Sequence, residues 1–148
     1  MLAAITGILA SADGESVDLS KGWTDVWDGL KGDGAFAGVT GLAVPRFEAP
    51  FTPCVEIGWR LAPAHWGQGY ATEAARAALA FGFKTAGLEE IVSFTVPANL
   101  PSRSVMERLG MTRRPEDDFD HPALPSGHEL RRHVLYRLRR ADWARPSS

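Results

Sequence analysis

The sequence contains a single cysteine, Cys54, among its 148 residues. One cysteine excludes an intrachain disulfide and any metal site made of several cysteines, and we therefore expect a reducing, cytoplasmic setting. Cys54 follows Pro53 at the start of an apolar stretch. This position favours a buried or half-buried structural thiol over a nucleophile.

The sequence also lacks a strong charge imbalance and a long apolar run. Its net charge of −2 gives no general electrostatic reason to bind nucleic acid or an anionic membrane. Residues 1–10 are apolar, but this run is too short to span a bilayer and lacks the basic start of a secretory signal. We therefore expect one globular domain over residues 1–148, with neither a nucleic-acid nor a membrane partner.

Strand-like and helix-like segments alternate along the chain. Period-two patterning predicts strands, and helical spacing of apolar residues predicts helices. Thr72 is expected to cap the first helix and Gly87 to end it. This order predicts an α/β fold with a mixed sheet. The expected strands are 23–27, 35–44, 55–62, 91–96 and 133–139, the expected helices are 72–85 and 102–109, and 114–131 is expected to be a long polar loop.

The loop Trp66-Gly67-Gln68-Gly69-Tyr70-Ala71-Thr72 joins a strand to a helix. Glycines allow a ligand to approach the backbone closely, and the free N–H groups at a helix N-terminus attract an anion. This arrangement is typical of a phosphate-binding site. Two glycines before a helix also fit an ordinary strand-to-helix turn, so the loop alone leaves both interpretations open.

A second segment, Asn99-Leu100-Pro101-Ser102, precedes a short helix that ends in Leu109-Gly110-Met111. Together with the Trp-Gly-x-Gly-Tyr-Ala-Thr-Glu-Ala loop of residues 66–74, it resembles the GNAT superfamily of acyl-CoA-dependent N-acetyltransferases. The likeness is closest to the branch of the ribosomal-protein acetyltransferases RimJ and RimL, and it covers about residues 34–143. It is specific because both motifs occur in the right order, each in the secondary-structure setting that it needs.

The resemblance implies a mixed β-sheet that is splayed between two central strands and flanked by helices, with acetyl-CoA entering the gap. A GNAT domain usually opens with a strand and two helices, and residues 1–22 carry no such amphipathic helix pair. We therefore expect the N-terminal strand-helix-helix portion to be reduced. Those helices normally wall the acceptor site, so either the protein is a truncated member or another protomer supplies the wall. Because a domain short of these helices should leave an apolar sheet face uncovered, we expect a homodimer.

The resemblance also implies which residues bind acetyl-CoA as co-substrate. The pyrophosphate is expected on the backbone N–H groups of the glycine loop, and the pantetheine arm along the strand end and beside Asn99. The side chains of Trp66 and Tyr70 are expected to pack at the base of the helix. The expected cofactor-binding residues are Trp59, Leu61, Trp66, Gly67, Gln68, Gly69, Tyr70, Ala71, Thr72, Asn99 and Ser102.

Acetyl transfer to an amine requires a base for the amine proton and a proton for the departing thiolate. Glu56 stands between Val55 and Ile57, where desolvation would raise its pKa, and it matches a glutamate that serves as base in some GNAT enzymes. A structural glutamate paired with an arginine is the alternative. Many members protonate the thiolate with a tyrosine. Met106 stands at that position and cannot donate, so Ser102 is the candidate, with helix capping as its alternative role.

Acidic residues and histidines gather near the C-terminal end. Their spacing matches no compact zinc pattern, so we expect no metal, and we interpret the segment as an acceptor-binding loop or a solvated loop. The expected function is acetyl transfer from acetyl-CoA to an amine of unknown type, either a protein N-terminus or a small molecule. An acyl-CoA-binding remnant without activity is the alternative. The gathered residues are Asp117, Asp118, Asp120, His121, His128 and His133.

Overall fold

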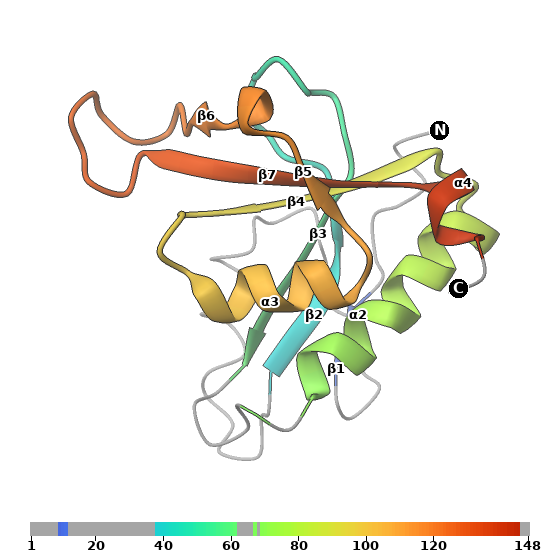
Figure 1. The fold of residues 1–148 in the computed structure, drawn as a ribbon. Helices are drawn as coiled ribbons and strands as arrows, with labels where there is room; N and C mark the ends of the chain where they lie inside the picture. Colours follow the sequence, from blue (N-terminus) through green and yellow to red (C-terminus); the bar gives the residue numbers. More distant parts are fainter. Residues whose placement is uncertain (1–8, 12–37, 62–66, 68, 146–148) are drawn as a thin grey trace.

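A computed structural model describes residues 9–11, 38–61, 67 and 69–145 of the chain (Figure 1). The expected strand 23–27, most of the segment 1–22, and the loop residues Trp66 and Gln68 lie outside the described residues. The segment that resembles the GNAT superfamily, about residues 34–143, falls almost entirely within the described residues.

The described part of the chain forms a mixed sheet of seven strands. Its order is β1-β2-β3-β4-β7-β5, and β6 also pairs with β7. All neighbours are antiparallel except β3 and β4, which are parallel. The sequence did not predict β5 or β6, because two residues are too few to carry a period-two signal. The strands are β1 Leu9–Ser11, β2 Gly38–Ala43, β3 Glu56–Leu61, β4 Glu90–Thr95, β5 Thr112–Arg113, β6 Phe119–Asp120 and β7 Arg132–Arg139.

The first predicted helix is present, but it begins earlier than expected. Helix α2 spans Tyr70–Ala80 and continues into one π-type turn, Phe81–Thr85. Gly87 follows with φ of +68°, which confirms its place after the helix end. Helix α3 spans Leu100–Arg108, a single 3₁₀ turn spans Pro115–Asp117, and α4 spans Arg140–Trp143.

The sheet splays between β3 and β4. Strand β3 pairs with β2 along its whole length, but it pairs with β4 only at Glu56 opposite Val92. At this point the Val92 N–H donates to Val55 O at 3.0 Å, and Ser93 Oγ donates to Ile57 O at 2.8 Å. Figure 1 shows β2 and β3 running at a steep angle to β4 and β7. The splayed mixed sheet that the resemblance implied is therefore confirmed.

The buried Ser93 side chain ties β4 to β3 at the point where the strands separate, and its exposed fraction is only 2%. Ser93→Ala would leave the carbonyl of Ile57 without this donor. We expect the variant to lower the free energy of unfolding by about 1–2 kcal/mol. Urea denaturation measures this loss. An unchanged midpoint with an unchanged slope would show that the hydrogen bond adds nothing to stability.

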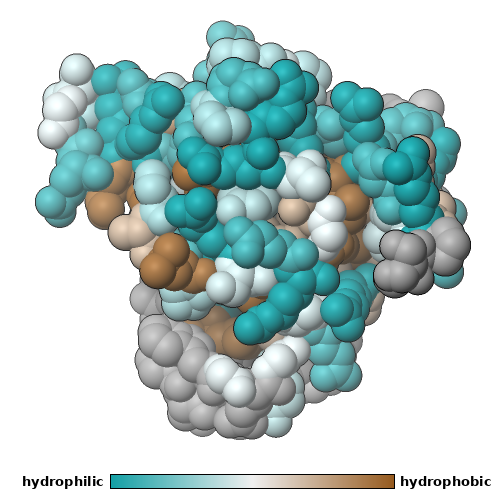
Figure 2. All heavy atoms as spheres, viewed as in Figure 1, coloured by the Kyte–Doolittle hydropathy of each residue, from teal (hydrophilic) through white to brown (hydrophobic). Residues whose placement is uncertain are grey.

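Hydrophobic side chains cover both faces of the sheet. Helices α2 and α3 pack on one face, where Leu42, Ile57 and Ile91 are almost fully buried. The other face is covered by the loop between β2 and β3 together with β6, around Phe119 and Leu135. On the side of the molecule seen in Figure 2, hydrophobic residues show only in separate small areas of a mostly hydrophilic surface.

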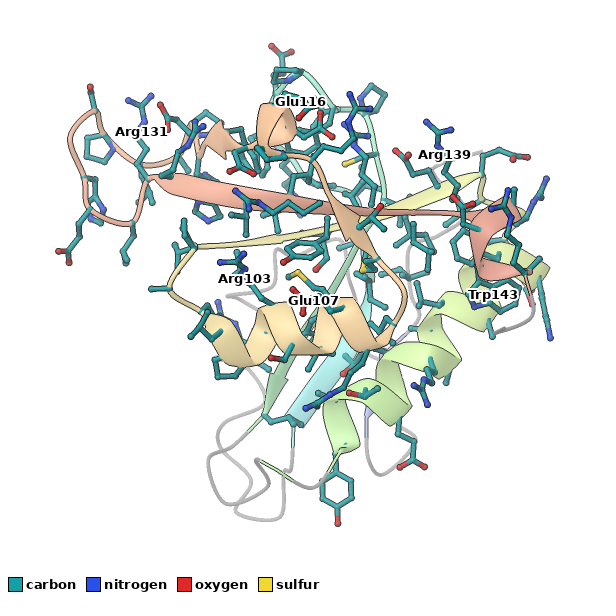
Figure 3. All side chains as sticks on the ribbon, viewed as in Figure 1. Arg103, Glu107, Glu116, Arg131, Arg139 and Trp143 are labelled. Carbon is teal, nitrogen blue, oxygen red and sulfur yellow. The ribbon has the colours of Figure 1, made fainter. Side chains whose placement is uncertain are left out.

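Helix α3 is fixed at both its first turn and its middle. Asn99 is the N-cap, and its Oδ1 accepts the Ser102 N–H at 3.3 Å. Arg103 and Glu107 point from α3 toward β7 (Figure 3), where Arg103 Nε donates to Tyr136 Oη and Tyr136 Oη donates to Glu107 Oε1, both at 3.2 Å. These contacts hold the first turn of α3 at the mouth of the splay.

Candidate active site

Two cavities meet at the splay between β3 and β4. One, of about 750 Å³, opens toward the glycine loop and the N-terminus of α2, and we call it the cofactor cavity. The other, of about 590 Å³, lies toward the β2–β3 loop and the start of β7, and we call it the acceptor cavity. Both volumes are ordinary for small-molecule sites. The residues that line both are Trp59, Arg60, Asn99 and Ser102.

The cofactor cavity gathers every predicted cofactor residue that the structure describes. Gly67 and Gly69 have φ of +75° and +79°, and a Cβ on either would meet no atom within 4 Å. Glycine is needed there because L-residues rarely adopt this conformation, and the open space leaves the backbone accessible. Arg108, which the sequence reasoning missed, adds a cation. The predicted residues that line this cavity are Trp59, Leu61, Gly67, Gly69, Tyr70, Ala71, Thr72, Asn99 and Ser102.

The N-terminus of α2 carries groups suited to an anion. Its N-cap is Gly69, which has no side chain to cap the helix, and the first intrahelical bond runs from Glu73 N–H to Gly69 O. The N–H groups of Ala71 and Thr72 therefore have no acceptor within the helix. Thr72 Oγ1 is buried and has no hydrogen-bond partner among the residues that the structure describes. A phosphate placed here would meet N–H donors, a hydroxyl and the positive helix end, so these residues fit the pyrophosphate of acetyl-CoA.

One local prediction about this helix start is wrong. Thr72 does not cap α2, because the left-handed Gly69 turns the chain into the helix three residues earlier. Tyr70 is the first helical residue, and its exposed fraction is 44%.

Glu56 lines the acceptor cavity and not the cofactor cavity. Its neighbours Val55 and Ile57 point into the helix-covered core, and the alternation of β3 places Glu56 on the opposite face. Cys54 shares that face. Burial, and then the negative charge of Glu56, raise the pKa of the Cys54 thiol to about 12. Such a thiol stays protonated near neutral pH, which agrees with a structural and not a nucleophilic role.

The histidines of the C-terminal segment separate in the structure. His121 and His133 line the acceptor cavity, whereas His128 is exposed outside it. Among the described residues, no group of three or more His, Cys, Asp or Glu side chains is arranged to hold a metal ion. No helix in the described ranges is long and apolar enough to cross a membrane.

Comparison with known proteins agrees with this geometry. The model of the family described as "Acetyltransferase (GNAT) domain" matches residues 7–112. The chain belongs to the GNAT acetyltransferase family. A solved GNAT acetyltransferase from Bacillus anthracis is 33% identical with a TM-score of 0.57, and the match covers 76% of this chain and 63% of that one. The α/β GNAT fold is thus shown by sequence and by structure.

Two curated relatives are similar to this chain over part of their own length. The uncharacterized N-acetyltransferase YnaD of Bacillus subtilis is 38% identical over 88 residues, which is 60% of this chain and 50% of YnaD. The FsC-acetyl coenzyme A-N(2)-transacetylase of Aspergillus fumigatus is 38% identical over 125 residues, which is 80% of this chain and 52% of that protein. The chain thus spans about half the length of the curated relatives it matches.

Proposed function

We propose that this protein transfers an acetyl group from acetyl-CoA to an amine. The observation that carries the proposal is the meeting of two cavities at the splay, with Trp59, Arg60, Asn99 and Ser102 shared between them. A thioester that enters from one side and an amine that enters from the other would come together at these four residues. Group transfer by direct attack requires such proximity.

The cofactor cavity offers separate supports for the pyrophosphate and for the pantetheine arm of acetyl-CoA. The glycine loop and the first turn of α2 would hold the pyrophosphate, with Arg108 as a nearby cation. Beyond Glu56, β3 has no register partner on β4, so the backbone at Trp59 and Leu61 borders the gap. A pantetheine amide could pair there as an added strand.

The chemistry balances with one base and one proton donor. Glu56 would take the proton of the ammonium or attacking amine, the amine nitrogen would bond to the thioester carbonyl carbon, and the carbon–sulfur bond would break. The departing thiolate would then take a proton, for which Ser102 is the candidate donor; the serine would regain a proton from solvent, and Glu56 would release its own to solvent. Glu56 lines only the acceptor cavity and Ser102 lines both, as these two roles require.

Two measurements test the proposal against a non-catalytic acyl-CoA-binding role. A thermal shift with acetyl-CoA tests binding, because a ligand of the folded state raises the melting temperature. Release of the CoA thiol with a panel of amines tests transfer. Binding with no thiol release from any amine would favour the non-catalytic alternative, and absence of binding would exclude both.

Ser102→Ala is expected to lower turnover by about tenfold, less than is typical for a general acid, because water can substitute and the CoA thiolate is a tolerable leaving group. The Michaelis constant for acetyl-CoA should rise only slightly, since the Asn99 cap, which uses the backbone N–H of Ser102 and not its hydroxyl, stays in place. Steady-state thiol release measures both. Ser102→Thr, which keeps a hydroxyl, is the control. Loss of stability and cofactor affinity together, with normal turnover per folded molecule, would assign Ser102 a structural role only.

The branch of the family and the class of acceptor are proposals that rest on sequence similarity. The motif of residues 66–74 favours the RimJ/RimL-like branch and a protein N-terminus as acceptor. The transacetylase relative, named for acetylation at an N(2) nitrogen, favours a small-molecule amine. We also propose that residues 1–148 form one domain and that the protein self-associates as a homodimer. Sedimentation velocity at micromolar concentration tests the homodimer, and a monomer would exclude it.

A further inference from the structure

The acceptor cavity has a wall of aromatic and imidazole rings. Phe47, Phe94, His121 and His133 all line it. The ring centroids lie 4.5 Å apart for Phe47 and His121, 5.1 Å for His121 and His133, and 6.1 Å for Phe94 and His133. Phe119 lies 5.5 Å from both Phe94 and His133 and backs this wall. The rings come from the β2–β3 loop, β4, the segment around β6, and β7.

Hydrogen bonds to the backbone determine the neutral tautomers of the two histidines. Nδ1 of His133 lies 3.0 Å from Arg131 O, and a carbonyl oxygen only accepts, so Nδ1 carries the hydrogen and Nε2 the lone pair. Nδ1 of His121 accepts the Ala123 N–H at 3.2 Å, so in this neutral ring Nε2 carries the hydrogen. Burial, and then the neighbouring His133, lower the pKa of His121 below its usual value. In these tautomers the Nε2 atom of His133 is an acceptor and that of His121 a donor.

The described residues that line the acceptor cavity carry more positive than negative charge. Among them, Glu56 is the single carboxylate, whereas Arg46 and Arg60 are two exposed guanidinium groups. A second or third positive charge on an acceptor would meet these two arginines without a second carboxylate among the described lining residues, which disfavours a polycation.

We propose that the acceptor cavity binds a single primary amine carried on an aromatic ring with a polar substituent, and that His121 and His133 bind that substituent. This inference rests on the proposed function and adds the class of acceptor. The ring of the acceptor would pack against Phe47 and Phe94 in edge or offset contact. A hydroxyl group can accept from Nε2 of His121 and donate to Nε2 of His133.

Tyramine and spermidine distinguish this class from polyamines. We expect kcat/KM for tyramine to exceed that for spermidine by at least about tenfold, the factor that one well-placed buried polar contact provides. Thiol release with saturating acetyl-CoA measures both. An equal or higher kcat/KM for spermidine would overturn the proposal.

Asparagine variants test the two rings with the fold preserved. Asparagine at position 121 can still accept the Ala123 N–H through its side-chain oxygen, and at position 133 its amide can still donate to Arg131 O. His121→Asn and His133→Asn should each raise KM for tyramine by about tenfold and leave KM for acetyl-CoA unchanged. His128→Asn is the matched control, because Nδ1 of His128 accepts the Leu130 N–H at 3.0 Å in a similar turn outside the cavity. Equal effects of all three variants would assign the rings a structural role.

Imidazole NMR decides the question independently of turnover. Long-range ¹H–¹⁵N spectra should show a hydrogen on Nε2 of His121 and on Nδ1 of His133, and tyramine should shift both rings but not His128. If tyramine moves neither ring, the acceptor class is wrong even if the enzyme is active. If tyramine moves both rings but acetyl-CoA does not bind, the proposed function fails while this site stands.

Discussion

Replacing Glu56 with glutamine is expected to lower turnover by a hundredfold or more, the usual contribution of a general base. Glutamine keeps the size of the side chain but cannot take the amine proton. The loss of turnover should be largest at low pH, where most of the amine is protonated and needs the base. It should be smaller at high pH, where much of the amine is already deprotonated in solution. Thiol release across a pH series, with acceptor and acetyl-CoA both saturating, measures this dependence.

The control for this variant is Glu48→Gln, an exposed carboxylate on the loop between β2 and β3 that does not line either cavity. It should leave turnover and its pH dependence unchanged. Glu56→Gln should also bind acetyl-CoA normally, because Glu56 lines only the acceptor cavity. If Glu56→Gln lost thermal stability and cofactor affinity while turnover per folded molecule was preserved, Glu56 would be a structural residue of the sheet and not the base.

The sequence could predict most residues of the cofactor cavity because they lie in two short segments. The glycine loop with the start of α2, and Asn99 with the start of α3, each supply several contacts within a few residues. Local chemistry determines both: positive φ requires glycine, and a helix N-terminus exposes N–H groups. The structure places these segments along one cavity, with Trp59 between them.

The acceptor side could not be predicted in the same way. Phe47, Phe94 and His133 are far apart in the sequence, and each fits an ordinary core position when considered alone. The pairing of β4 with β7, which places Phe94 opposite Leu135, brings Phe94 and His133 together, and the β2–β3 loop packs Phe47 beside Phe94. The sequence did single out His121 and His133, because histidine can bind a ligand. Their tautomers, however, depend on contacts with the backbone of a loop whose sequence shows no periodic pattern. The splay likewise depends on where the pairing of β3 with β4 stops, which hydrophobic patterning does not encode.

Gly69→Asp is expected to abolish or strongly weaken acetyl-CoA binding. The added Cβ would meet no protein atom within 4 Å, so the carboxylate would extend into the space where we propose the pyrophosphate lies. Two unit charges about 4 Å apart repel by about 1 kcal/mol in water and about 4 kcal/mol near a protein surface. At about 1.4 kcal/mol for each factor of ten, the dissociation constant should rise by between about fivefold and about seven hundredfold. Isothermal titration with acetyl-CoA measures it.

Backbone strain must be separated from this charge effect, because Gly69 has φ of +79° and any side chain there is strained by about 1–2 kcal/mol. Gly69→Ala carries the strain without the charge. Gly87→Asp carries both at φ of +68°, also with nothing within 4 Å, but at the far end of the helical segment and outside the cofactor cavity. We expect all three variants to lose some stability. Only Gly69→Asp should show the full increase in the dissociation constant for acetyl-CoA. If Gly69→Asp bound acetyl-CoA as tightly as the parent, the pyrophosphate would have to lie elsewhere, and the cofactor cavity would lose its assignment.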